Sequence, residues 1–184
     1  MPAVSAFNNR KLRFRQREPL QAVAAVAFET LDRTHAQVLA TLADLERLVE
    51  HLEAHGIDHQ ARADAAMICT FFSSTARDHH ATEEQQVFPG LLREPDADLV
   101  QCVERLQQDH GWLEEDWIEL EPQLQAVARG SSWYDFDTLR HAVGVFATLY
   151  QEHIALEESV AYPAARRLGA GRARSADAGA TLEP

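Results

Sequence analysis

The sequence has few residues that interrupt helices or cross-link chains. Its 184 residues include only 8 Gly and 7 Pro, the two residue types that most disfavour a helix interior. The 2 Cys, Cys69 and Cys102, form no Cys-x-x-Cys motif and are too few for a disulfide framework. We therefore expect a helical protein of a reducing, cytoplasmic compartment whose thiols act as small core residues.

Positive charge is also scarce. The chain has 17 Lys and Arg against 29 Asp and Glu, a formal net charge of -12. An acidic surface repels phosphate backbones and anionic lipid headgroups, so neither nucleic acid nor a membrane surface is expected as a partner. No apolar run approaches the roughly 20 residues of a membrane-spanning helix, and the N-terminal segment lacks the apolar region of a signal peptide. A soluble, cytoplasmic protein is expected.

Apolar residues recur at alternating steps of three and four in four long segments, which is typical of amphipathic helices. We predict helices over residues 20–54, 61–93, 97–128 and 136–168. No segment has the pattern of a β-strand. Because short connections make neighbouring helices antiparallel, the expected fold is all-α: an up-down-up-down antiparallel four-helix bundle.

Two flanking segments differ from the bundle at residues 20–168. Residues 1–19 form a basic N-terminal arm, which is either a contact for a protein partner or a solvated terminus. Residues 169–184 are small and polar, and their composition indicates a disordered tail.

Each predicted helix carries a His at a position where the apolar stripe requires a core residue. The second and fourth helices also carry a Glu four residues later, a spacing that places both side chains on one helix face. The six residues are His35, His79, Glu83, His110, His153 and Glu157. Burying an ionised Glu without a partner costs several kcal/mol in order of magnitude. The set therefore needs a shared explanation.

The chain repeats one helical hairpin. His79-x3-Glu83 with Pro89 recurs 74 residues later as His153-x3-Glu157 with Pro163. Within each hairpin the two His lie equally far from the connecting turn, so antiparallel packing brings all six polar residues into one layer. Four imidazoles and two carboxylates suit two transition-metal ions with bridging carboxylates. This donor set fits iron, and also manganese or zinc.

His80 and Tyr150 lie near the predicted layer, and the sequence leaves the role of each open. His80 and Glu84 form a second pair four residues apart, but the fourth helix has Ile154 where the first hairpin has His80. The repeat therefore favours His79 and Glu83, with His80 as a candidate supporting ligand. Tyr150 lies one turn before His153, where it either hydrogen-bonds to the metal site or fills the core.

Two segments, HHATEEQQVFP and HIALEESVAYP, resemble the signature of the hemerythrin-like, or HHE cation-binding, family. A His on each of the first and third helices also matches this family. The resemblance covers residues 25–168. It implies a four-helix bundle that holds a non-haem di-iron centre with two carboxylate bridges. Carried over to this chain, the bridges are Glu83 and Glu157, one iron is held by His35 and His79, and the other is held by His110 and His153.

One position departs from the oxygen carriers of this family. They have His-x3-His on the third helix, whereas His110 is followed here by Glu114. Glu114 is an extra ligand, an acceptor for a ligand, or a solvent-facing residue. A carboxylate in place of an imidazole would stabilise ferric iron, which favours a redox, sensing or iron-handling role over reversible oxygen carriage.

The resemblance therefore implies a di-iron protein that binds or responds to oxygen, nitric oxide or peroxide. The alternatives are an iron-handling or iron–sulfur repair module, or a sensor that acts through a partner protein. The sequence has no phosphate loop, nucleotide motif or activated nucleophile, and it leaves open whether the chain is an enzyme.

Overall fold

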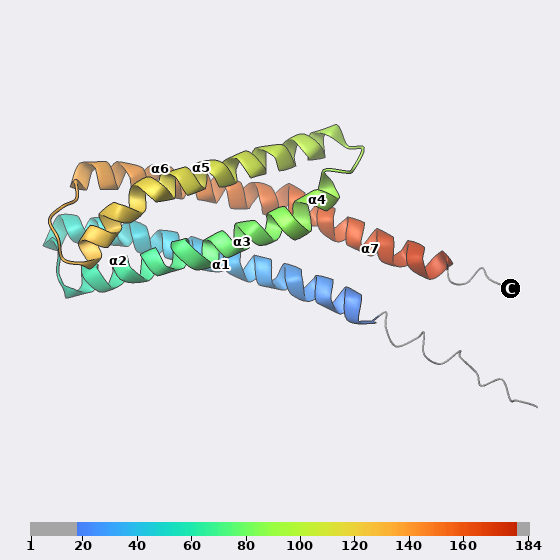
Figure 1. The fold of residues 1–184 in the computed structure, drawn as a ribbon, viewed down its shortest axis with the longest axis horizontal. Coiled ribbons are helices and arrows are strands. Elements are labelled where there is room, and N and C mark those ends of the chain that lie inside the picture. Colours follow the sequence, from blue (N-terminus) through green and yellow to red (C-terminus); the bar gives the residue numbers. More distant parts are fainter. Residues whose placement is uncertain (1–17, 180–184) are drawn as a thin grey trace, which may run out of the picture.

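The computed structural model describes residues 18–179. Within that range the chain forms four long helical rods joined by short connections, with no strand. Figure 1 shows the rods side by side, with the beginning of the first rod and the end of the last rod at the same end of the bundle. The predicted all-α four-helix bundle is confirmed. None of these helices is long and apolar enough to cross a membrane.

Two of the rods are single helices and two contain wider π-helical turns. The first rod is α1 (Glu18–His55), and the third is α5 (Ala97–Ala128). The second rod consists of α2 (His59–Phe71), η1 (Phe72–Ala76), α3 (Arg77–Thr82), η2 (Glu83–Val87) and α4 (Phe88–Leu91). The fourth consists of α6 (Phe136–Leu156), η3 (Glu157–Ala161) and α7 (Tyr162–Gly179). α1 and α5 each pack against both α2 and α6, which closes the bundle.

Local sequence signals place the ends of the rods. Asp58, Asp96 and Asp135 precede the second, third and fourth rods, and each carboxylate accepts a hydrogen bond from a backbone N–H of the first helical turn. Such caps satisfy donors that have no partner within the helix. Gly56 and Gly130 follow the first and third rods with φ of 71°, a conformation that favours glycine.

The fourth rod is longer than its sequence pattern predicts. α7 continues to Gly179, beyond the end predicted at Leu168. The added segment contains Ala and Arg, which favour a helix, and has no Pro. The described helix therefore extends into the segment expected to be a disordered tail. Residues 1–17 of the basic arm and residues 180–184 of the predicted tail lie outside the described residues.

The π-helical turns explain why proline recurs in the repeat. η2 and η3 begin at Glu83 and Glu157, and each ends just before an aromatic residue followed by Pro89 or Pro163. A proline ring clashes with the carbonyl four residues earlier and donates no hydrogen bond. The N–H of the aromatic residue after each turn, Phe88 or Tyr162, donates to the glutamate carbonyl five residues back, which widens the helix at that point. Such wide turns are frequent at functional sites.

The core consists of two apolar clusters. The larger one lies toward the connections between paired rods and contains Leu42, Phe72, Trp117 and Phe146. The smaller one lies toward the chain ends and includes Phe88. Both cysteines are free, with Cys69 buried in the larger cluster and Cys102 half-buried beside the smaller one. The polar layer lies between these clusters, which exclude water from it on two sides.

The larger cluster should dominate the stability of the bundle. Leu120 is fully buried in it, whereas Ile118 on the same helix is 58% exposed. We expect Leu120→Ala to lower the free energy of unfolding by about 2–5 kcal/mol. Ile118→Ala should change it by no more than about 0.5 kcal/mol. Denaturant unfolding of the metal-free chain measures both values, and equal losses would contradict the assignment of Leu120 to the core.

Candidate metal centre

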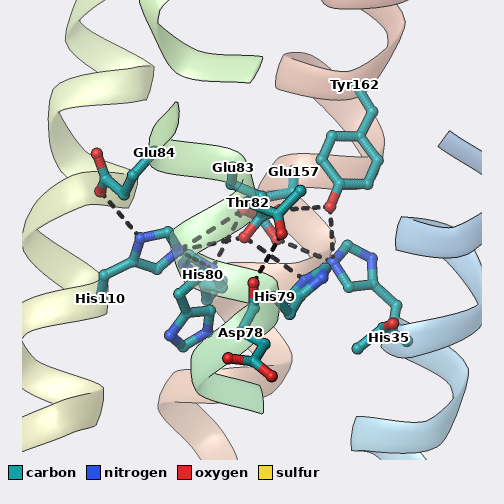
Figure 2. A network of polar contacts seen from close by, with 12 residues as sticks. His35, Asp78, His79, His80, Thr82, Glu83, Glu84, His110, Glu157 and Tyr162 are labelled. Atoms are coloured by element: carbon teal, nitrogen blue, oxygen red, sulfur yellow. Dashed lines mark hydrogen bonds and ion pairs between the residues drawn. The ribbon is translucent and has the colours of Figure 1, made fainter. Parts of the chain in front are cut away.

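The six polar residues that the repeat predicts meet in one layer, midway between the two apolar clusters. All six side chains are buried. Figure 2 shows the labelled members of this set converging from different helices on a common centre. They come from every rod: His35 from α1, His79 from α3, Glu83 from η2, His110 from α5, His153 from α6 and Glu157 from η3.

The layer contains two overlapping groups of candidate ligands. In the first, one ligand atom from each of His35, His79, Glu83 and Glu157 lies within 4.8 Å of all the others. In the second, the same holds for Glu83, His110, His153 and Glu157. Both carboxylates belong to both groups. The Oε2 atom of Glu157 is 3.1 Å from Nε2 of His35, and its Oε1 atom is 3.3 Å from Nε2 of His153. One carboxylate therefore faces both halves of the layer.

Several oxygens in the layer have no hydrogen-bond partner. They are Oε2 of Glu83 and both carboxylate oxygens of Glu157, and both residues are 0% exposed. Buried polar atoms without a hydrogen bond are uncommon in folded proteins because each keeps its desolvation cost. Carboxylate and imidazole atoms that converge without mutual hydrogen bonds suit a divalent or trivalent cation. The residues present therefore fit a metal centre.

The charges of the metal-free layer are distributed unequally. Burial raises the pKa of Glu83 to about 7. Burial also acts to raise the pKa of Glu157, but the imidazoles of His153 and His35, 3.3 and 3.1 Å from its carboxylate oxygens, hold it well below its ordinary value. Burial acts to lower the pKa of His153, yet Asp109 and Glu157 raise it to about 9. One carboxylate is thus paired with an imidazolium while the other retains a proton near neutral pH. Metal ligands must be deprotonated, so a bound cation would displace these protons.

The second glutamate of each Glu-Glu pair orients a histidine from the other hairpin. Oε1 of Glu84 lies 3.1 Å from Nδ1 of His110, and Oε1 of Glu158 lies 3.1 Å from Nδ1 of His35. A carboxylate on Nδ1 fixes the imidazole so that Nε2 faces the centre. The spacing of the motif predicts Glu84 only as a rival ligand, so this role was missed. The duplicated Glu-Glu was the signal that could have revealed it.

A buried aspartate was also missed. Asp109 is 1% exposed, and its Oδ2 atom lies 3.8 Å from both Nδ1 of His153 and Nε of Arg105. In the first hairpin, Thr34 is at the position of Asp109. His79, the counterpart of His153, therefore has no such carboxylate beside it, and its Nδ1 atom has no hydrogen-bond partner. The two halves of the layer therefore share their inner donors but differ in the groups behind them.

Glu114 lies away from the layer. Its carboxylate accepts hydrogen bonds from Arg77, including one of 2.9 Å from Nε, and its side chain is 42% exposed. It belongs to neither group of candidate ligands. Of the three alternatives left open for this residue, the outward-facing one agrees with its position.

His80 and Tyr150 lie together on the side of His110. The Tyr150 hydroxyl is 3.3 Å from Nε2 of His80, and the His80 ring stacks on that of His110 with centroids 4.1 Å apart. One ligand atom from each of His80, His110 and His153 lies within 4.8 Å of the others. His80 is therefore a third imidazole for this half, and Tyr150 contacts the layer through it.

Comparison with known sequences agrees with a cation-binding role. The family model for the hemerythrin HHE cation binding domain matches residues 26–165. The chain belongs to this family. An uncharacterised protein of Haemophilus influenzae is 31% identical to it over 130 residues, which cover 71% of this chain and 73% of the relative. No solved structure gives a significant match. This HHE domain thus brings its candidate cation ligands together in one buried layer.

The role of Glu84 can be tested by metal affinity. We expect Glu84→Ala to weaken the binding of ferrous iron about 10- to 100-fold, because His110 loses the acceptor that orients it. Anaerobic titration with ferrous iron measures the change. Glu104→Ala, on the exposed face of α5, is the matched control and should bind as the unmodified chain does. An unchanged affinity in Glu84→Ala would show that His110 is positioned by other contacts.

Proposed function

We propose that this HHE domain holds a non-haem di-iron centre and uses it to bind or respond to oxygen, nitric oxide or peroxide. The observation that carries the proposal is the pair of ligand groups that share two buried carboxylates. A site for a single ion needs only one such group. Two groups with two carboxylates in common favour two ions with carboxylate bridges.

The roles follow from the positions of the side chains. Glu83 and Glu157 would be shared by the two ions. His35 and His79 would hold one ion, and His110 and His153 would hold the other. His80 adds a third imidazole on the side of His110.

When bound, iron supplies electrons and a coordination position for a small oxidising ligand. The chain controls what reaches it. A cavity of about 10 Å³ extends to His80 and Tyr150 and is lined on its outer side by Arg77 and Glu114. This volume is close to the minimum that holds one water molecule. It leaves no room for an organic substrate, which supports a small molecule as the ligand.

The position of Glu114 bears on whether the proposed iron centre favours redox chemistry or reversible oxygen binding. A carboxylate ligand at Glu114 would stabilise the ferric form of the iron. The ion pair with Arg77 keeps that charge outside the layer, and His80 supplies a neutral imidazole there instead, because burial and neighbouring imidazoles hold its pKa well below its ordinary value. The charge of Glu114 therefore gives no reason to disfavour reversible oxygen binding.

Burial favours a retained metal over an iron-donating module. Both bridging carboxylates are 0% exposed, and apolar clusters cover the layer on two sides. Release of iron to another protein would require the bundle to open. We therefore place the iron-handling alternative second. A chelator that strips iron within seconds from the folded chain would reverse this order.

The composition of the centre is tested by metal analysis and absorption. Protein loaded anaerobically with ferrous iron should contain two irons per chain. Exposure to air should produce near-ultraviolet bands of oxo-bridged ferric iron, and dithionite should bleach them. Titration of the ferrous form with nitric oxide and with oxygen then tests the ligand. Zinc or manganese in place of iron, with no coloured form after iron loading, would contradict the proposal.

One substitution tests the bridging arrangement. Glu157→Ala should reduce iron content to less than one per chain, because it removes a ligand from both ions. Glu119→Ala, on the exposed face of α5, should retain two. Iron content is measured by elemental analysis after gel filtration. A Glu157→Ala protein that keeps two irons would show that this carboxylate is not a shared ligand.

A further inference from the structure

A buried phenol lies within the polar layer. Tyr162 is the first residue of α7 and is 0% exposed. Its hydroxyl lies 3.1 Å from Nε2 of His35 and donates a hydrogen bond to Oε1 of Glu83. Its ring stacks on that of His35, with centroids 5.1 Å apart and planes 9° apart. Figure 2 shows its hydroxyl pointing at the centre where these side chains converge.

The contacts of His35 show which side of the imidazole the phenol approaches. Nδ1 of His35 is taken by Glu158, so Nε2 is the nitrogen that faces the layer. Oε2 of Glu157 lies 3.1 Å from this same Nε2 atom. The hydroxyl oxygen of Tyr162 thus lies among the inward-facing donor atoms of this half. A group that only supported a ligand from behind would contact Nδ1 instead.

The distances suit ligands of a common ion. Two donor atoms at right angles around a metal, each about 2.1 Å from it, are separated by about 3.0 Å. The Tyr162 hydroxyl and His35 Nε2 are 3.1 Å apart. On the other half, the Nε2 atoms of His110 and His153 are 3.2 Å apart. The phenol is as close to its neighbouring imidazole as two proposed ligands are to each other.

Comparison of the two hairpins shows that the phenol of Tyr162 belongs to the half of the layer with His35 and His79. The equivalent position of the other half has no hydroxyl. The residue that corresponds to Tyr162 in the first hairpin is Phe88, which stacks near His110 with centroids 5.5 Å apart but has no hydroxyl. The half with Phe88 has His80 as an additional donor, and the half with Tyr162 has Ile154 at that position. Each half of the layer therefore gains one extra donor, an imidazole on one side and a phenol on the other.

We propose that Tyr162 is a further metal ligand, which binds ferric iron through its phenolate oxygen beside His35 and His79. This inference rests on the proposed di-iron function. The phenolic proton, which now lies in the hydrogen bond to Glu83, is released to solvent when the oxygen binds the ion. Because the anionic oxygen favours the ferric state, the two ions of the pair differ in their ease of reduction.

The visible absorption of the iron-loaded chain tests the proposal. A phenolate bound to ferric iron gives a charge-transfer band in the visible region, which histidine and carboxylate ligands do not. We expect this band in the oxidised protein. It should be lost in Tyr162→Phe, which should still contain two irons by elemental analysis. Tyr134→Phe, in the connection before α6 and outside the layer, is the matched control and should retain the band.

Resonance Raman spectroscopy of the unmodified protein gives a result that does not depend on how the variants fold. Excitation within the band should enhance tyrosinate ring vibrations, and these should shift when the protein is made with ring-deuterated tyrosine. A chain that holds two irons but has no tyrosinate vibrations would overturn the proposal and leave the di-iron function intact. A band that survives in Tyr162→Phe but vanishes in Tyr150→Phe would assign the ligand to the other tyrosine and also overturn it. A chain that binds no iron would overturn both proposals.

Discussion

Two carboxylates are buried at the centre of this bundle, and much of the surrounding structure serves to hold them there. Glu83 and Glu157 are 0% exposed, a position that is costly for an ionised group unless it is paired. Four imidazoles face them, one from each rod. A π-helical turn begins at each glutamate, and the next glutamate along the chain orients a histidine of the opposite hairpin. These features are consistent with a site that positions ligands for a cation.

The internal repeat produces a symmetric inner arrangement with asymmetric surroundings. Each half contributes one carboxylate and two imidazoles to the layer. Behind the ligands, Asp109 stands where the first hairpin has Thr34, and within the layer Tyr162 stands where it has Phe88. The two carboxylates also differ: burial raises the pKa of Glu83, whereas the imidazoles of His153 and His35 outweigh burial and lower that of Glu157. The two halves of the layer differ in their additional donors, His80 in one and Tyr162 in the other, although related sequence motifs build them.

The sequence left the role of Glu114 open, for a reason that helix geometry explains. Glu114 is four residues after His110, a spacing that predicts a common face. The inward positions on that part of α5 are taken by Leu113 and Trp117, which are buried in the larger apolar cluster. Glu114 lies at the edge of that face, where Arg77 from the neighbouring rod reaches its carboxylate. Spacing within one helix could not reveal a partner that another helix supplies.

The sequence by itself determined the four helices and the layer of His and Glu, because apolar periodicity and repeats are local properties of the chain. It also contained the proline spacing that accompanies each π-helical turn. The tertiary structure decided which imidazole nitrogen faces inward, which carboxylate orients it, and that the hydroxyl of Tyr162 reaches the layer. Those outcomes depend on side chains from helices distant in the sequence, and only the packing of the bundle brings them within hydrogen-bonding distance.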